Sequence, residues 1–131
     1  MRHLFDNTKV VASLVPAVRT ADANGTGVDT QGYENGMLVV SAGAIDLAST
    51  DETYSVLIEE SDDNSSFAPV AGLSVAITAA NQVGVLRLAN LNITRKRYLR
   101  AVLDVGGTTP SFAGGAVIML DGGDAGPVNS D

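Results

Sequence analysis

Apolar side chains recur at every second position along much of this chain. In residues 53–60, Tyr54, Val56 and Ile58 stand at alternate positions, so an extended backbone places these three side chains on one face. Segments with apolar residues at helical spacing are almost absent. The pattern therefore predicts an all-β protein.

Short apolar runs also recur between clusters of turn-forming residues. They predict about eight short strands, at residues 9–20, 37–42, 53–60, 67–70, 74–78, 83–88, 97–105 and 111–120, with a turn or a weak strand at 23–30. Such spacing is typical of an antiparallel β-sandwich, and we expect a jelly-roll-like arrangement. A parallel sheet is not expected, because no segment between the runs is suited to a crossover helix.

Three local features refine this prediction. Pro16 cannot donate a ladder hydrogen bond, so the first strand is expected at a sheet edge or with a bulge. Residues 99–103 are apolar on both faces, which favours a central position for the strand at 97–105, and Gly106-Gly107 is typical of a hairpin leading into the last strand. The expected core includes Val40, Val56, Ile58, Leu86, Leu88, Leu99, Leu103, Ile118 and Leu120.

A chain of 131 residues suits a single domain. We divide it into an N-terminal arm (residues 1–10), one sandwich (11–120) and a flexible C-terminal tail (121–131) rich in Gly and Asp. The sequence shows no signal-peptide pattern, no run long enough to span a membrane and no cysteine. We therefore expect a protein that is made and folded in the cytoplasm.

The charge balance narrows the range of partners. Fifteen acidic residues outnumber eight basic ones, giving a net charge of −7, so nucleic acids and membrane surfaces are not expected as partners. Four of the basic residues nevertheless fall within residues 95–100. This cluster is interpreted either as a solvated strand entry or as a patch that docks on an acidic partner.

No combination of residues points to catalysis, and we do not expect an enzyme or a cofactor. The single histidine, His3, lies near the N-terminus, so neither a catalytic triad nor a three-ligand zinc site can be assembled. The acidic stretch 59–64 has oxygen ligands of the kind that calcium prefers, but it lacks the spacing of a calcium loop. It favours a turn in which Asp, Asn and Ser side chains bond their own backbone.

A carbohydrate-binding module is the main alternative for a small β domain. Sugar-binding platforms present exposed aromatic rings, and this chain has no tryptophan, three tyrosines and three phenylalanines. Tyr33, near a predicted turn, is the one aromatic candidate for such a platform.

Three sequence blocks carry a resemblance. They read GVDTQGYE at residues 27–34, YSVLIEESDD at 54–63 with Phe67 following, and KRYLRAV at 96–102. In this order the blocks resemble a group of small proteins encoded among the virion-structure genes of tailed bacteriophages and prophages. The group includes head decoration (cement) proteins, and the likeness covers roughly residues 20–120.

The resemblance implies a structural virion protein that binds the outer surface of the capsid and stabilises the lattice. Its partner would be the major capsid protein, its location the capsid exterior after assembly in the host cytoplasm, and its form a homo-oligomer, with a trimer expected first. The alternatives are a neck, tail or fibre-base accessory protein, or a small carbohydrate or cell-surface binding module. The expected partner contacts are Arg2, His3, Phe5, Arg95, Lys96 and Arg97.

Overall fold

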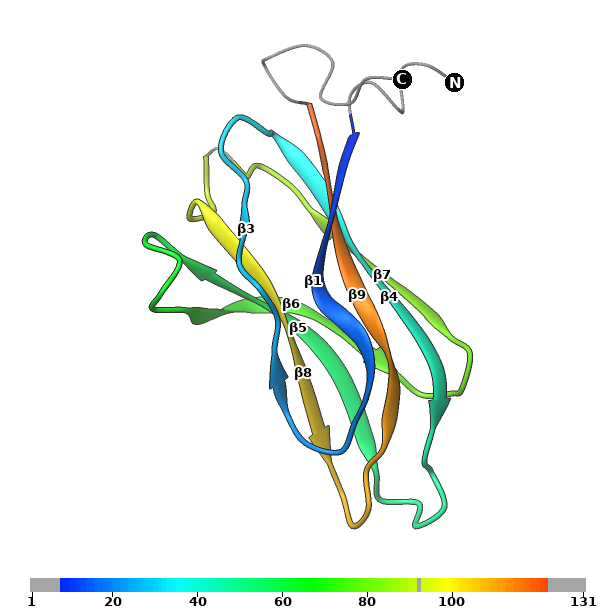
Figure 1. Ribbon diagram of the computed structural model, residues 1–131. Coiled ribbons are helices and arrows are strands. Elements are labelled where there is room, and N and C mark those ends of the chain that lie inside the picture. The colour runs from blue at the N-terminus through cyan, green and yellow to red at the C-terminus, as the bar shows by residue number, and fades with distance from the viewer. Residues whose placement is uncertain (1–7, 92, 123–131) are drawn as a thin grey trace.

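The computed structural model describes residues 8–91 and 93–122, and every regular element in this part of the chain is a β-strand (Figure 1). It contains no helix long and apolar enough to cross a membrane. The strands are β1 (Thr8–Arg19), β2 (Ala23–Asn24), β3 (Val28–Asp29), β4 (Asn35–Ile45), β5 (Thr53–Ser61), β6 (Ala68–Ile77), β7 (Val83–Leu88), β8 (Tyr98–Gly106) and β9 (Phe112–Asp121).

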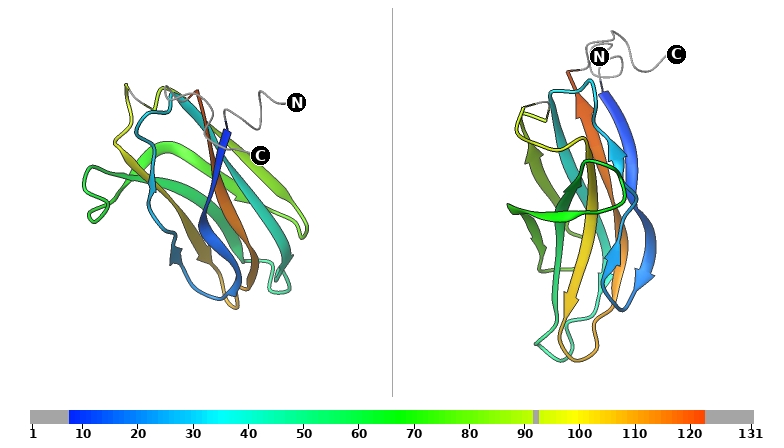
Figure 2. Two further views of the ribbon diagram at one scale, coloured as in Figure 1. Left: turned by 45° about the horizontal axis from the view of Figure 1, so that its top comes forward. Right: turned by 90° about the vertical axis from the view of Figure 1, so that its left-hand side faces the viewer.

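The strands form two antiparallel sheets packed face to face (Figures 1 and 2). One sheet has the order β1-β9-β4-β7, and the other has the order β2-β8-β5-β6, with β3 pairing β8 beside β2. The predicted β-sandwich is thus confirmed. The segment expected as a weak strand is split into β2 and β3, and the two short strands expected at 67–70 and 74–78 are joined as β6.

The connections make the arrangement a jelly roll. Only β5 and β6 are consecutive full-length strands paired within one sheet. Apart from the short link between β2 and β3, the other links cross from one sheet to the other. The predicted hairpin at Gly106-Gly107 is therefore wrong, because β8 and β9 belong to different sheets. The local turn is real: Gly107 has φ 103° and lies so close to Asp51 that a Cβ would be 2.6 Å from its carbonyl oxygen.

The core between the sheets is formed by the side chains on the inward-facing side of each strand. Eight of the nine predicted core residues are fully buried, and Leu86 is half-buried against them. Phe112, which was not among the nine, is also completely buried and lies 6.0 Å from the Tyr54 ring. The Tyr54 hydroxyl donates to the Asp46 carbonyl and accepts from the Ser111 N–H, so this buried polar group is satisfied.

Strand β1 is an edge strand with two irregularities in its register with β9, as Pro16 predicted. The irregular part crosses closely over β9, where a Cβ on Gly115 would lie 2.5 Å from the Leu14 carbonyl oxygen. Arg19 stabilises this path by donating to the carbonyls of Val15 and Gly114. The distortion of β1 is therefore built into the packing.

The sheet extends slightly beyond the predicted domain limits. Strand β1 begins at Thr8 and β9 ends at Asp121, so residues 8–10 and 121 belong to the paired strands rather than to an arm or a tail. The remainder of the predicted arm lies outside the described residues, and with it the proposed contacts Arg2, His3 and Phe5.

Candidate docking surface

The outer face of the β1-β9-β4-β7 sheet is apolar over most of its width. We call this surface the apolar face; its outward-facing rows are Val10, Met119, Met37 and Arg87, then Ala12, Val117, Val39 and Val85, then Gly115, Ser41 and Val83. Val10, Val83 and Val85 are 56%, 61% and 58% exposed. A single charged side chain, Arg87, stands at the edge of these three rows. A contiguous apolar surface of this kind is typical of a site of contact with another molecule.

A shallow groove of about 390 Å³ crosses this face. Val39, Ser41 and Val117 line it from the outward-facing rows, and Gly114 and Gly115 leave part of it without side chains. The apolar face is therefore hollowed as well as hydrophobic, and a protruding side chain of a partner can fill this groove.

The outer face of the second sheet is different in character. Across β5 and β8, Ser55 lies opposite Asp104 and Glu59 opposite Arg100, while Leu57 and Val102 form an apolar pair between them. The outer face of the second sheet therefore carries charged and hydroxyl groups, and the Glu59–Arg100 pair among them is largely covered.

The basic cluster at residues 95–100 is paired with acidic residues of the same chain. The Arg97 guanidinium donates to both carboxylate oxygens of Asp29, at 2.9 and 2.8 Å. Arg100 donates twice to Glu59, at 2.9 and 2.6 Å, and its guanidinium stacks 4.2 Å from the centre of the Phe67 ring. Both pairs join segments that are distant in sequence.

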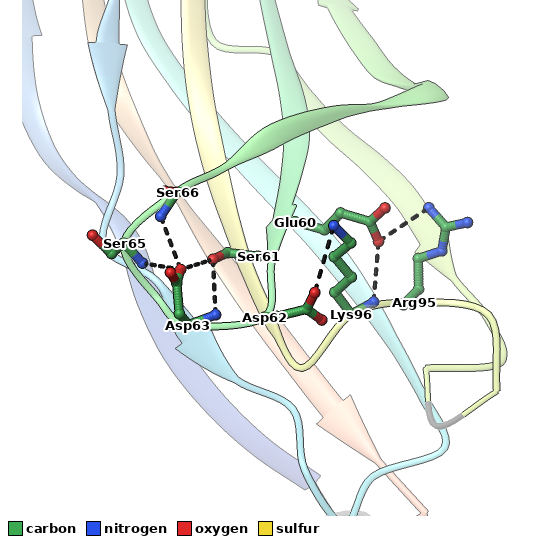
Figure 3. Close-up of polar contacts among 8 residues, drawn as sticks. All are labelled: Glu60, Ser61, Asp62, Asp63, Ser65, Ser66, Arg95 and Lys96. Atoms are coloured by element: carbon green, nitrogen blue, oxygen red, sulfur yellow. Dashed lines mark hydrogen bonds and ion pairs between the residues drawn. The ribbon is translucent and has the colours of Figure 1, made fainter.

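The other two cations of the cluster contact the β5–β6 hairpin (Figure 3). Arg95 lies 3.6 Å from Glu60, whose carboxylate also accepts the Lys96 N–H, and the Lys96 ammonium lies 3.7 Å from Asp62. All four cations thus have an acidic partner within the chain. The expectation of a strand entry agrees with the position of Arg95, Lys96 and Arg97 directly before β8, whereas Arg100 lies within that strand. Partner contact by Arg95, Lys96 and Arg97 stays a prediction.

Two carboxyl groups near this cluster have lowered pKa values. The hydrogen bonds from Arg97 hold the pKa of Asp29 below its usual value. The Ser66 N–H, the Ser61 hydroxyl and the Ser65 N–H all donate to Asp63 and lower its pKa to about 2 (Figure 3). The Asp63 carboxylate is therefore engaged by its own turn, which confirms the interpretation of the acidic stretch as a hairpin turn.

The aromatic candidate for sugar binding does not form an exposed platform. Tyr33 is half-buried and packs against the core. Among the described residues, no group of three or more acidic or histidine side chains is arranged to hold a metal ion.

The apolar face was not anticipated from the sequence, although a signal for it exists. Residues 37–40 and 116–120 are apolar at consecutive rather than alternate positions. In a two-layer sandwich only one face of each strand can be buried by the other sheet. A strand that is apolar on both faces therefore presents apolar side chains outward, and two neighbouring strands of this kind predict an exposed patch.

Comparison with known proteins identifies similar folds. No protein-family model matches the chain, and no curated protein matches its sequence. The PBSX exported protein XepA has a similar structure, with TM-score 0.57 and 20% identity over 98% of this chain and 41% of XepA. The SPBc2 prophage-derived protein YomS is similar with TM-score 0.50 and 10% identity over 88% of this chain and 95% of YomS. The chain thus spans less than half of XepA, and the similarity is one of fold.

Proposed function

We propose that this protein is a structural component of a bacteriophage particle that binds the outer surface of the capsid and stabilises its lattice by contact, without catalysis. The observation that carries the proposal is the apolar face, which is exposed on a well-packed sandwich. The resemblance of three sequence blocks to virion proteins supports it. So does the similarity of the fold to that of a prophage-derived protein.

The size of the apolar face indicates how such a protein would bind. Four strands spaced about 4.8 Å apart, with about six residues each at about 3.3 Å, give an area of roughly 400 Å². A stable pairwise interface buries about 800 Å² on each partner. One copy would therefore hold weakly, and the strength of the layer would come from many copies repeated on the lattice.

The jelly roll suits this mechanical role. Its two sheets share one continuous core, so a load applied to the apolar face is transmitted through side-chain packing to the whole domain. A homo-oligomer would multiply the contacts, and the trimer expected from the resemblance is one such assembly.

The test is the copy number of this protein in purified virions of the phage or prophage that encodes it. Quantitative mass spectrometry is scaled to the major capsid protein. Decoration of the head predicts a copy number comparable to that of the capsid subunit. A dozen or so copies would indicate a neck, tail or fibre-base protein instead, and complete absence from particles would contradict the proposal.

A further inference from the structure

The two sheets have four open sides, at β1, β7, β6 and the short pair β2 and β3. An unpaired edge offers free N–H and C=O groups to any other strand, and proteins usually blunt such edges with proline, bulges or short strands. Strand β1 contains Pro16 and two register shifts, and β6 contains Pro69 and one register shift. Strands β2 and β3 have two residues each.

Strand β7 is not blunted in any of these ways. All six of its residues pair with β4 in an uninterrupted register, and it contains no proline. Its side chains Val83 and Val85 are more than half exposed. Figure 1 shows it as the outermost strand of its sheet.

The backbone groups of β7 point in known directions. The Gln82 carbonyl accepts from the Ala42 N–H of β4, and the groups of successive residues alternate between the two sides of a strand. The N–H and C=O groups of Val83, Val85 and Arg87 therefore point away from β4. No hydrogen bond joins them to another residue in the described part of the chain.

The neighbouring strand β6 leaves this edge accessible. It belongs to the other sheet and packs on β7 at Gly84, where an added Cβ would lie 2.9 Å from Val75. Towards Leu88 the two strands separate, and a groove of about 520 Å³ lies between them.

The charge near β7 also permits contact between identical molecules. The chain carries a net charge of −7, yet residues 64–103 contain no Asp or Glu. Arg87 is the single charged residue of the strand. The paired residues 36–41 of β4 carry no charge, so two copies can approach through this edge without bringing carboxylates of these strands together.

We propose that β7 pairs in antiparallel fashion with β7 of a second copy, around a two-fold axis at Val85. In this register Val85 lies opposite Val85 of the second copy, and Val83 lies opposite Arg87, so the two guanidinium groups stay apart. The free groups of all three residues then find partners. The inference does not rest on capsid binding, and it extends the apolar face across both copies.

The same edges determine the symmetry. A closed trimer built by strand pairing needs β7 to pair with a different edge of its neighbour. The other edges in the described part of the chain are blunted, so the contact is isologous and yields a dimer. The dimer would replace the trimer as the expected unit.

The first test is sedimentation equilibrium from about 10 µM to about 1 mM. This range is chosen because a contact between two single strands is small and therefore weak. We expect a monomer–dimer equilibrium. Val83→Glu places a carboxylate opposite Arg87 of the second copy twice per dimer, and it should tighten the dimer about three- to tenfold. Val83→Gln, which is uncharged, should weaken it. A monomer at every concentration, a trimer, or no tightening by Val83→Glu would overturn the proposal.

A second test uses the absence of cysteine from the chain. Val85 and Val15 are each 58% exposed. Under mild oxidation Val85→Cys should give a disulfide-linked dimer, since opposite residues of an antiparallel pair lie within disulfide range, and Val15→Cys should not. Val85→Pro removes an N–H that points away from β4, so it should abolish the dimer with little change in Tm. Equal cross-linking of both cysteine variants would contradict the proposed axis.

Discussion

The two sheets of this sandwich share one core but differ on their outer faces. The β1-β9-β4-β7 sheet presents Val10, Met37 and Val85, with one arginine at its edge. The β2-β8-β5-β6 sheet presents Glu59, Arg100 and other polar groups that are largely paired with one another. The polar groups on the outer face of the second sheet bind water or form ion pairs with one another, whereas the outer face of the first sheet leaves apolar side chains exposed. This difference points to the first sheet as the side that meets a partner.

The largest expected effect comes from placing a charge on the apolar face. Met37→Asp should reduce binding to capsids at least about tenfold, because docking would bury a carboxylate. In the free protein the new carboxylate lies opposite Arg87 and stays solvated, so the fold should be retained. Binding is measured by co-sedimentation with capsids that lack the protein.

Ser74→Asp is the matched control for this experiment. Ser74 is exposed and lies opposite the outward-facing Leu57 on the second sheet, so it adds the same charge to the other face. We expect unchanged capsid binding. Equal loss in both variants would show that net charge controls binding, and no loss in Met37→Asp would remove the apolar face from the proposed docking surface.

The next largest effect is expected on the free energy of unfolding, when two ion pairs of the second sheet that differ in burial are broken. The side chains of Arg100 and Glu59 are 19% and 15% exposed, whereas those of Arg97 and Asp29 are 45% and 44% exposed. Arg100→Met leaves a largely buried carboxylate without its partner and should lower the free energy of unfolding by about 2 kcal/mol. Arg97→Met should lower it much less, because water screens an exposed ion pair. Urea denaturation measures both.

The double variant Glu59→Gln/Arg100→Met serves as the control for this interpretation. Neutralising the carboxylate should recover much of the loss caused by Arg100→Met, because the cost arises from the unpaired charge rather than from the missing side chain. Equal losses for the two arginine variants would mean that burial does not set the strength of these pairs.

The sequence predicts the local features of the two sheets but not the contacts between strands that are distant in the chain. Local patterns predicted the strands, the edge position caused by Pro16 and the hairpin turn around Asp63, because each depends on neighbouring residues. The pairing of Glu59 with Arg100 depends on β5 and β8 lying side by side, and these strands are not consecutive in the chain. The turn at Gly106-Gly107 was also predicted from local residues, but the strand that follows it, β9, lies in the other sheet.

The apolar face was missed because consecutive apolar residues were interpreted only as a sign of burial. Residues 37–40 supply one buried and one exposed row, and the sequence alone does not say which sheet covers which row. The candidate contacts were instead sought in the N-terminal segment and in the basic cluster at residues 95–97, which stands out in an acidic chain. The exposed valines give no such contrast.

The smallest expected effect concerns the hairpin turn on the polar side. Backbone and hydroxyl donors lower the pKa of Asp63 from 3.8 to about 2. A carboxyl whose pKa is lowered by folding keeps its stabilising bonds above its unfolded value and loses them as the pH falls through the folded value. The Ser65 and Ser66 amide resonances should therefore shift with a midpoint near pH 2, as measured by NMR. Asp63→Asn, which keeps an acceptor but does not titrate, should remove this transition, and a midpoint near 3.8 in the unmodified protein would show that the turn does not hold the carboxylate.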